Sequence, residues 1–187
     1  MEITGVILAG GKSSRMGQDK GLLKFNGKSL IQYAIDTLKP ITSQIIIIAN
    51  NYSYNTFNYP VYNDIIKNKG PVGGIYTALT HSQTKTNIIL SCDTPFVSTE
   101  LLKLLLAKHQ NYDVTLPKYN HKIHPIVGIY NTSNLSHFKQ SLYNNHLKLI
   151  EVNQQINTQI VEIDTKHFKQ NIFYNINTPT QLKQAIK

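Results

Sequence analysis

Residues 4–11 read TGVILAGG, a short apolar run that ends abruptly in two glycines. The run contains β-branched side chains, and a pattern of this kind is typical of a buried strand that leads directly into a loop. We therefore expect a strand over residues 4–9 and a loop that begins at Gly10 and Gly11.

Two further runs have the same apolar character. Residues 44–49 read QIIIIA, and four successive isoleucines without polar alternation predict a strand covered on both faces, which favours a parallel sheet. Residues 87–91 read NIILS and are followed by CDTP, where Pro95 has no amide hydrogen to donate to a neighbouring strand. The sequence thus predicts three strands of a mostly parallel sheet.

Segments with helical spacing separate these strands. In residues 29–38 apolar side chains recur three to four positions apart, and similar patterns predict helices over 73–82 and 99–110. Ser98 or Thr99 is expected to cap the third helix. Because strands and helices alternate, the sequence predicts an α/β fold of the doubly wound type.

The pattern is less regular after Asp113. We expect a helix near 134–143 and short strands at 114–116, 125–130, 160–163 and 173–176. The Asn-rich stretch 50–58 is expected to be surface loop. No internal repeat or Gly/Ser/Pro linker divides the 187 residues, and a chain of this length suits one core, so we expect a single domain over 1–187.

The bulk composition limits the class of protein. Hydrophobic residues make up 41% of the chain and charged residues 16%, which favours a globular domain over disorder. The net charge of +9 attracts anions in general, and three readings stay open: solubilising surface charge, attraction of a phosphate-bearing substrate, and nucleic-acid binding. Because the lysines are scattered singly without a basic run, nucleic acid is the least favoured partner.

Cysteine usage and hydropathy indicate a location. The one cysteine, Cys92, has no partner for an intramolecular disulfide, and we expect it to pack as a small buried hydrophobe in a reducing compartment. The apolar start of the chain is far shorter than the roughly 18 residues of a membrane span and lacks the features of an export signal. We therefore expect a cytoplasmic protein without a membrane partner.

The loop after the first strand is the most informative segment. Residues 8–20 read LAGGKSSRMGQDK, with three glycines, Arg15 and two lysines that include Lys20. Glycines let backbone amides approach a phosphate closely, and the cations can neutralise its charge. The spacing excludes both the P-loop and the dinucleotide fingerprint. An ordinary strand-ending turn whose basic residues face water is the alternative reading of Gly10 and Gly11.

The same stretch closely resembles the signature of the molybdenum cofactor guanylyltransferase family, L-A-G-G-x-S-x-R-M-G-x-D-K. The wider nucleotidyltransferase superfamily usually has Ala where Gly10 stands and Pro before the lysine, so Gly10 and Asp19-Lys20 favour the guanylyl branch. The resemblance implies a three-layer, Rossmann-like nucleotidyltransferase domain with a mostly parallel central sheet. It also implies that residues up to about 112 bind the nucleotide and that the remainder forms the acceptor side.

Two downstream segments extend the resemblance. Asn63-Asp64 leads into GPVGG at 70–74, which is similar to the family's G-P-L-x-G segment with Val72 in place of Leu. Asp64 is expected to accept hydrogen bonds from guanine, although 70–74 also reads as an ordinary helix-entry loop. Asp93 follows a strand, where open α/β sheets place ligands, and the family's Cys-Asp-Thr-Pro implies Mg²⁺ there. A helix cap is the alternative role of Asp93.

Three residues of the C-terminal part are candidates for the acceptor side. His124, before Pro125, resembles the family's H-P segment, although a histidine is more often a surface or packing residue. Asn175 and Asn177 lie in NINTP, which is similar to the family's N-x-N-T-P. Asn177 could cap the closing helix or point into the site, and these two readings stay open.

The resemblance implies a magnesium-dependent transfer of GMP from GTP to molybdopterin, with release of pyrophosphate. Arg15, Lys20 and Asp93 are the expected catalytic residues, and Asp93 is the expected metal ligand. The expected nucleotide-binding residues are Leu8, Ala9, Gly10, Gly11, Lys20, Asp64, Gly70, Pro71, Gly73 and Asp93.

Other proteins of cofactor biosynthesis, and molybdoenzymes, are candidate partners of such a transferase. Two rival functions remain open at this stage. One is a nucleotidyltransferase of the same fold that uses CTP or a sugar phosphate. The other is a GTP-binding adaptor without turnover.

Overall fold

The computed structural model describes residues 2–10, 19–178 and 181, and everything said below of the structure concerns these residues. The strands of the main sheet are β1 (Ile3–Leu8), β4 (Gln44–Ile48), β5 (Val61–Tyr62), β6 (Thr86–Ser91), β7 (Val114–Tyr119), β8 (Lys122–Ile123), β9 (Val127–Asn131) and β10 (Thr158–Glu162). A small hairpin pairs β2 (Lys24–Phe25) with β3 (Lys28–Ser29). The α-helices are α1 (Leu30–Leu38), α2 (Gly70–His81), α3 (Thr99–His109), α4 (Leu135–Tyr143) and α5 (Leu149–Gln154). The 3-10 helices are η1 (Lys20–Leu22), η2 (Tyr52–Phe57) and η3 (Thr132–Asn134).

The main sheet has the strand order β10-β7-β9-β6-β1-β4-β5, with β8 paired to β7. β1 runs parallel to β4 on one side and to β6 on the other, and β4 runs parallel to β5. β9 runs antiparallel to both β6 and β7, and β7 runs parallel to β10. Along this path β9 alone is reversed, so the sheet is mostly parallel, as the sequence predicts.

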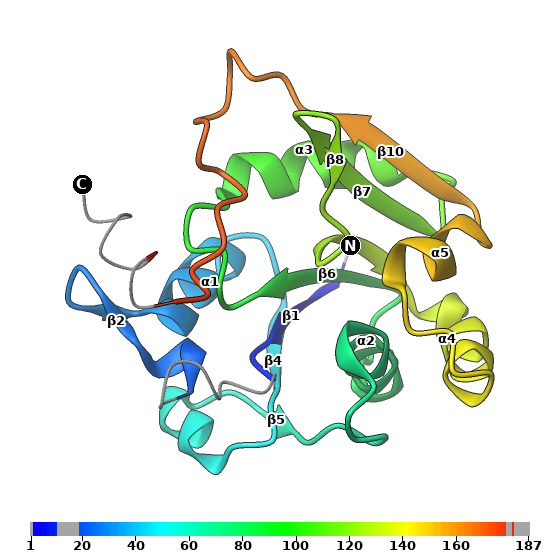
Figure 1. The fold of residues 1–187 in the computed structure, drawn as a ribbon, viewed down its shortest axis with the longest axis horizontal. Helices are drawn as coiled ribbons and strands as arrows, with labels where there is room; N and C mark the ends of the chain where they lie inside the picture. Colours follow the sequence, from blue (N-terminus) through cyan, green and yellow to red (C-terminus); the bar gives the residue numbers. More distant parts are fainter. Residues whose placement is uncertain (1, 11–18, 179–180, 182–187) are drawn as a thin grey trace.

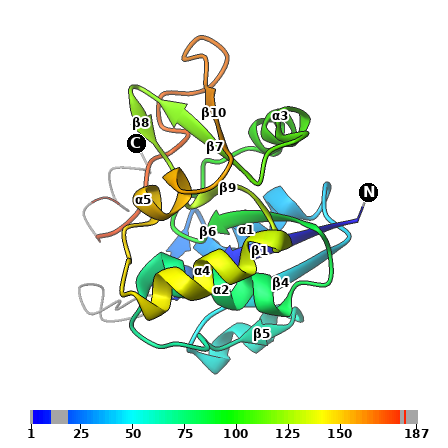
Figure 2. The ribbon, with the colours of Figure 1, turned by 90° about the vertical axis from the view of Figure 1, so that its right-hand side faces the viewer.

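Helices cover both faces of the sheet and make three layers (Figures 1 and 2). On one face α1 and α3 pack against the strands, with Leu38 and Leu105 fully buried. On the other face α2, α4 and α5 bury Ile75 and Phe138 completely. The predicted three-layer α/β fold is therefore confirmed.

The isoleucine run of β4 shows why two layers of helices are needed. Ile45 and Ile47 belong to the cluster with α1, whereas Ile46 and Ile48 belong to the cluster with α2. Successive side chains of a strand point to opposite faces, so a strand with two apolar faces leaves water only if both faces are covered. The absence of polar alternation in the sequence has this structural cause.

The N-terminal helices match their predictions with shifted ends. Ser29 is the N-cap residue of α1, and the Ser98 hydroxyl caps α3 by accepting a hydrogen bond from the Leu101 amide at 3.3 Å. Helix α2 begins at Gly70, three residues before the predicted start, because Pro71 occupies its first turn. Proline is favoured there since its missing amide hydrogen would have no partner within the helix.

Two predictions for loops and strands are wrong, and one predicted strand has a shifted start. Residues 173–176 form no strand: Phe173 and Ile176 are buried against the cores from a segment without ladder pairing. Stretch 50–58 contains the 3-10 helix η2, in which Tyr54 is fully buried, so it is not simply a surface loop. The strand expected at 125–130 is present as β9, with Pro125 and Ile126 in the turn before it. Helix α5 was not anticipated. Short apolar runs can cover a core without joining a sheet, and their pattern alone does not separate the two cases.

The order of the connections fixes where a ligand can bind. The chain leaves β1, crosses by way of α1 to β4 on one side, and later returns by way of α2 to β6 on the other side of β1. At such a switch point the loops diverge and leave a crevice at the carboxyl ends of the strands. No helix among the described residues is long and apolar enough to cross a membrane.

We predict that Gly128→Ala strongly destabilises the sheet. A Cβ at Gly128 in β9 would lie 2.9 Å from the Thr115 carbonyl oxygen and 2.7 Å from a Leu116 methyl group. The backbone oxygen cannot move without disturbing β7, so we expect a loss of about 3 kcal/mol. This corresponds to a fall in Tm of about 6–12 °C for a domain of this size.

The control for this prediction is Gly10→Ala. A Cβ at Gly10 would meet no atom closer than 3.8 Å, and the φ angle of Gly10 is not in the left-handed region. Thermal unfolding should therefore separate the two alanine variants. Equal Tm values for both would contradict the packing argument.

Candidate active site

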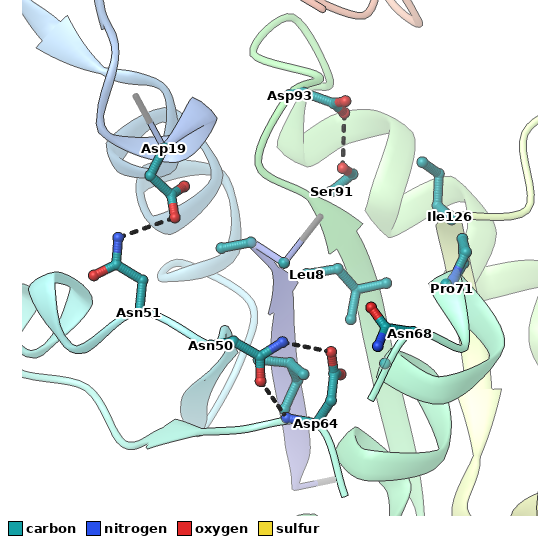
Figure 3. Close-up of a pocket in the computed structure, with 15 residues that line it drawn as sticks. Leu8, Asp19, Asn50, Asn51, Asp64, Asn68, Pro71, Ser91, Asp93 and Ile126 are labelled. Atoms are coloured by element: carbon teal, nitrogen blue, oxygen red, sulfur yellow. Dashed lines mark hydrogen bonds between the residues drawn. The ribbon is translucent and has the colours of Figure 1, made fainter. Parts of the chain in front are cut away.

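A cleft of about 600 Å³ opens at the carboxyl ends of β1, β4 and β6 (Figure 3). It lies at the switch point of the sheet, as the fold requires. The residues that line it are Leu8, Ala9, Gly10, Asp19, Ile48, Asn50, Asn51, Asp64, Asn68, Gly70, Pro71, Gly74, Ser91, Asp93 and Ile126. Of the ten predicted nucleotide-binding residues, seven line this cleft, and Lys20 lies beside it in contact with Asp93. Gly73 packs elsewhere, and Gly11 lies outside the described residues.

The end of β1 forms the floor of the cleft. The Ala9 amide donates to the Ile48 carbonyl oxygen at 2.9 Å, and the Cys92 amide donates to the Leu8 carbonyl oxygen at 3.1 Å. These bonds continue the pairing of β1 with its two neighbours beyond the strand. Gly10 is then exposed at the cleft, where the predicted phosphate loop begins. Gly11 and Arg15, predicted as members of that loop, lie outside the described residues.

Lys20, Asp93 and Asn177 meet at one end of the cleft. The Lys20 Nζ lies 3.2 Å from Asp93 Oδ2 and donates to Asn177 Oδ1 at 2.5 Å. The Ser91 hydroxyl donates to Asp93 Oδ1 at 2.7 Å. The side chain of Lys20 is 26% exposed and that of Asp93 is 11% exposed, so the ion pair is only partly screened by water. The structure thus brings together three predicted site residues, of which Lys20 and Asn177 are 157 positions apart in the chain.

Asn177 is positioned by the segment that follows β10. The Ile176 amide donates to the Asp93 carbonyl oxygen at 2.9 Å, and Ile176 is fully buried beside Phe25 and Leu30. This contact directs the Asn177 side chain toward Lys20. The amide oxygen of Asn177 accepts a hydrogen bond from Lys20 and therefore does not cap a helix. Its main-chain amide donates to Gln181 Oε1 at 2.7 Å. Asn175 is half-buried on the same segment and is not part of the cleft lining.

Asp64 lies at the opposite end of the cleft from this cluster (Figure 3). The Asn50 amide group donates to Asp64 Oδ2 at 2.8 Å, and the Asp64 main-chain amide donates to Asn50 Oδ1 at 3.1 Å. A Cβ on Gly74 would lie 3.9 Å from Asp64 Oδ1. Asp64 is therefore held in one orientation with a carboxylate edge beside the cleft.

The glycines of α2 divide into two roles. Gly74 lines the cleft, whereas Gly73 is buried on the other side, where a Cβ would approach the Ile66 carbonyl oxygen at 3.2 Å and Lys69 Cβ at 2.9 Å. Gly70 has a φ of +57°, a left-handed conformation that favours glycine. The 70–74 segment thus contributes Gly70, Pro71 and Gly74 to the cleft.

The titration of the buried Cys92 thiol argues against nucleophilic catalysis by this residue. Burial raises the pKa of the Cys92 thiol, and the Asp93 and Asp19 carboxylates raise it further. A thiol of this kind stays neutral and is a poor nucleophile. Cys92 is buried in the core beside the strands, as the sequence predicts, and it takes no part in the cleft.

The residues around Asp93 are compatible with magnesium. Among the described side chains, no three His, Cys, Asp or Glu residues group closely enough to hold a metal ion by themselves. Magnesium, however, needs only one or two carboxylates when phosphates and water supply its other ligands. The Asp93 carboxylate and the Asn177 amide oxygen both accept hydrogen bonds from Lys20, so they lie close together. Both are hard oxygen ligands, and this pair fits a metal ion that arrives with a nucleotide.

Comparison with known proteins identifies the family of this chain. A model of the MobA-like NTP transferase domain matches residues 5–156. The chain belongs to this family.

The MobA-like chain also has curated relatives of similar length. It is 40% identical to a probable molybdenum cofactor guanylyltransferase of Flavobacterium johnsoniae, with 96% of this chain and 94% of the relative covered. It is 34% identical to a protein of the same description from Carboxydothermus hydrogenoformans, with 99% and 95% covered. The predicted resemblance to the molybdenum cofactor guanylyltransferases is thereby confirmed.

Solved structures confirm the fold of the MobA-like domain. A crystal structure of molybdopterin-guanine dinucleotide biosynthesis protein A from Archaeoglobus fulgidus superposes with a TM-score of 0.82 at 23% identity. The match covers 97% of this chain and 96% of that one. At this identity the likeness establishes the architecture alone.

Sequence reasoning on this MobA-like domain missed several residues of the cleft. Asn50 and Asn51 follow β4 in the same way that Asp93 follows β6, and polar residues after a parallel strand mark the ligand edge of a sheet. That signal was present in the sequence. Ser91 and Ile126 carry no such signal, because their neighbours in the cleft come from distant segments.

His124 lies outside the cleft of the MobA-like domain. Its ring stacks on Phe173 with the centroids 4.0 Å apart, and its amide donates to the Pro117 carbonyl oxygen at 3.0 Å. Burial, together with the nearby positive charge of Lys122, lowers the pKa of His124 to about 4. In this structure His124 therefore packs the β7–β8 hairpin onto the segment that leads to Asn177.

We predict that His124 makes stability depend on pH. Histidine in the unfolded chain titrates near pH 6.5, about the ordinary value, whereas His124 in the folded chain titrates near 4. Between these values the unfolded chain binds more protons, so stability is complete above about pH 6.5 and falls as the pH drops toward 4. His124→Phe keeps a ring on Phe173 and removes this titration.

The measurement is chemical unfolding of wild type and His124→Phe at pH 7 and pH 4.5. We expect the variant to lose about 1 kcal/mol less than wild type over this interval, a value discounted for the half-exposed ring. The exposed His146, replaced by Phe, is the control and should leave the wild-type pH dependence unchanged. Parallel curves for wild type and His124→Phe would contradict the assignment.

Proposed function

We propose that this chain transfers GMP from GTP to molybdopterin, forming the guanine dinucleotide form of the cofactor and pyrophosphate. The observation that carries the proposal is the cleft itself, with a lysine–aspartate pair at one end and an oriented aspartate at the other. The family and the guanylyltransferase relatives support the same reaction. We further propose a cytoplasmic location, where GTP is available.

Asp64 is the proposed contact for guanine. Guanine presents N1–H and N2–H side by side, and a carboxylate can accept both hydrogen bonds at once. Asn50 donates to Asp64 Oδ2 and thereby fixes the plane of the carboxylate before the base arrives. Cytosine presents no such pair of adjacent donors, so an oriented Asp64 favours GTP over CTP.

Lys20 and the loop after β1 are the proposed contacts for the triphosphate. Gly10 leaves room for phosphate oxygens at the end of β1, and by the family resemblance Gly11 and Arg15 extend this site. Lys20 brings a positive charge to the same end of the cleft, next to Asp93. A cation placed there stabilises negative charge that builds up on the phosphate in the transition state.

The chemical step is an in-line displacement. A terminal phosphate oxygen of molybdopterin forms a bond to the α-phosphorus of GTP, and the bond from that phosphorus to the bridging oxygen of pyrophosphate breaks. The electron pair leaves with pyrophosphate, and no covalent enzyme intermediate is required. The protein contributes by positioning the two phosphates and by electrostatic stabilisation.

Asp93 and Asn177 are the proposed holders of Mg²⁺. When bound, the ion would offset charge on the phosphate oxygens as a Lewis acid. Lys20 already contacts both residues, so its positive charge balances the negative charge of Asp93 before substrate binds. The acceptor is proposed to enter from the side of Ile126 and Asn177, whereas Asn175 and His124 lie outside the cleft lining and are candidates for acceptor contact by the family resemblance alone.

The test of this function is pyrophosphate release with each nucleoside triphosphate in the presence and absence of molybdopterin. We expect release with GTP and Mg²⁺ only when molybdopterin is present, and loss of release with EDTA. Exclusive use of CTP would overturn the guanylyl assignment. GTP binding without turnover for any acceptor would favour an adaptor, and activity that survives EDTA would contradict the role of Asp93.

We predict that Lys20→Ala lowers kcat about 100-fold or more, because it removes a charge that acts on the transition state. Lys28→Ala is the matched control: Lys28 is exposed and pairs with Asp36 away from the cleft. It should keep kcat within about twofold, as expected for a surface ion pair. Steady-state kinetics and Tm are measured for both, and equal losses of kcat would contradict the assignment of Lys20.

A further inference from the structure

The two neighbours of Lys20 in the chain, Asp19 and Gly21, both contact η2, whereas the Lys20 side chain extends toward other segments. Lys20 opens the 3-10 helix η1, and its side chain reaches Asp93 and Asn177. The side chain of Asp19 points instead toward Asn51 and η2 (Figure 3). Since successive residues here diverge, whatever fixes Asp19 also fixes the starting point of the Lys20 side chain.

Three donors converge on the Asp19 carboxylate. Asp19 Oδ1 accepts from the Gly21 amide at 3.3 Å and from the Tyr54 hydroxyl, and Asp19 Oδ2 accepts from the Asn51 amide group at 3.1 Å. Both oxygens are thus engaged by the protein. Asp19 lines the cleft, yet its hydrogen bonds orient it away from a ligand role and toward an anchor role.

Tyr54 is the donor that lies deepest. Its side chain has no exposed surface, and it belongs to the core cluster that contains Ile47 of β4 and Ala49, the residue after that strand. Burial raises the pKa of Tyr54 above its ordinary value, so the hydroxyl keeps its single proton. The Ala9 carbonyl oxygen lies 3.4 Å away, a weaker acceptor than the adjacent carboxylate, so the proton goes to Asp19.

Gly21 is shaped to admit this tyrosine. A Cβ at Gly21 would overlap the Tyr54 hydroxyl, and Gly21 is itself buried. A glycine next to Lys20 therefore has a packing reason at this position, namely the close approach of Tyr54 to Asp19. The three successive residues thus act together. Asp19 is the anchor, Lys20 is the catalytic cation, and Gly21 leaves space for the Tyr54 hydroxyl.

We propose that Tyr54 is a positioning residue for the transfer reaction: through Asp19 it holds Lys20 where the lysine meets Asp93 and the substrate phosphates. The inference rests on the function proposed above and adds a residue from η2 that takes no part in nucleotide contact. Asn51 supports the same anchor from the opposite oxygen of Asp19. Loss of the hydroxyl lets the η1 backbone shift, and small displacements of a catalytic charge reduce the rate strongly.

The first experiment compares Tyr54→Phe with Tyr33→Phe. Each change deletes one hydroxyl and keeps the ring: the Tyr33 hydroxyl donates to the Phe25 carbonyl oxygen at 2.9 Å, outside the cleft. We expect Tyr54→Phe to lower kcat about tenfold or more with KM for GTP changed less than about threefold, because the lysine acts on the transition state. Tyr33→Phe should keep kcat within about twofold, and the two variants should lose similar Tm.

The second experiment tests the route through Lys20. In a double-mutant cycle with Lys20→Ala, the Tyr54→Phe change should lower kcat by no more than about twofold further, because residues that act through one group are not additive. A further tenfold loss in the Lys20→Ala background would overturn the proposal. A fall of kcat shared equally by Tyr54→Phe and Tyr33→Phe would also overturn it, since it would reflect general loss of structure.

A third readout needs no turnover. Brief acetylation of the free protein with acetic anhydride, followed by peptide mass spectrometry, gives the reactivity of Lys20 relative to the exposed Lys103. We expect Lys20 to react at least about threefold faster in Tyr54→Phe than in wild type, since its charge-assisted contacts with Asp93 and Asn177 protect it in the wild-type protein. Unchanged reactivity would overturn the inference. Wild-type protein that fails to release pyrophosphate would refute the proposed reaction while this readout still decides the role of Tyr54.

Discussion

The parallel pairing of β1 with β4 on one side and β6 on the other is the constraint on which the rest of the molecule depends. It brings three strand ends to a common edge, with Leu8, Ile48 and Ser91 beside one another in register. Crossing helices must then lie on both faces, and the loops that leave these strands diverge. The cleft follows from this divergence and does not need a separate domain or subunit.

The polar side chains of the cleft are arranged in separate, mutually supported groups. Asp93 is balanced by Lys20 and Ser91, and Asp64 is oriented by Asn50. Partly buried charges are costly unless other groups satisfy them, so each carboxylate needs its own donors before a ligand arrives. Preorganised donors and charges of this kind cost little reorganisation during a reaction, which suits phosphoryl transfer.

The sequence indicated the strands 4–9, 44–49 and 87–91 and their alternation with helices because long, strongly apolar segments carry a clear period. It also indicated Lys20, Asp64 and Asp93 as site residues, because the short motifs that contain them resemble those of a known family. It failed for 173–176, where an apolar pattern predicted a strand, and for 50–58, where a polar composition predicted a surface loop. In the folded chain Phe173 and Tyr54 are buried by contacts with distant segments, and local composition does not report those contacts.

By itself the sequence determined the fold class, the family and the kinds of side chain available at the carboxyl ends of the strands, because these depend on local periodicity and short motifs. Only the tertiary structure decided which of them meet. The contact of Lys20 with Asn177 and that of Asp19 with Tyr54 each join segments far apart in the chain. Such contacts depend on strand order and on the paths of the connecting segments, which are fixed by packing of the whole core and not by any local pattern.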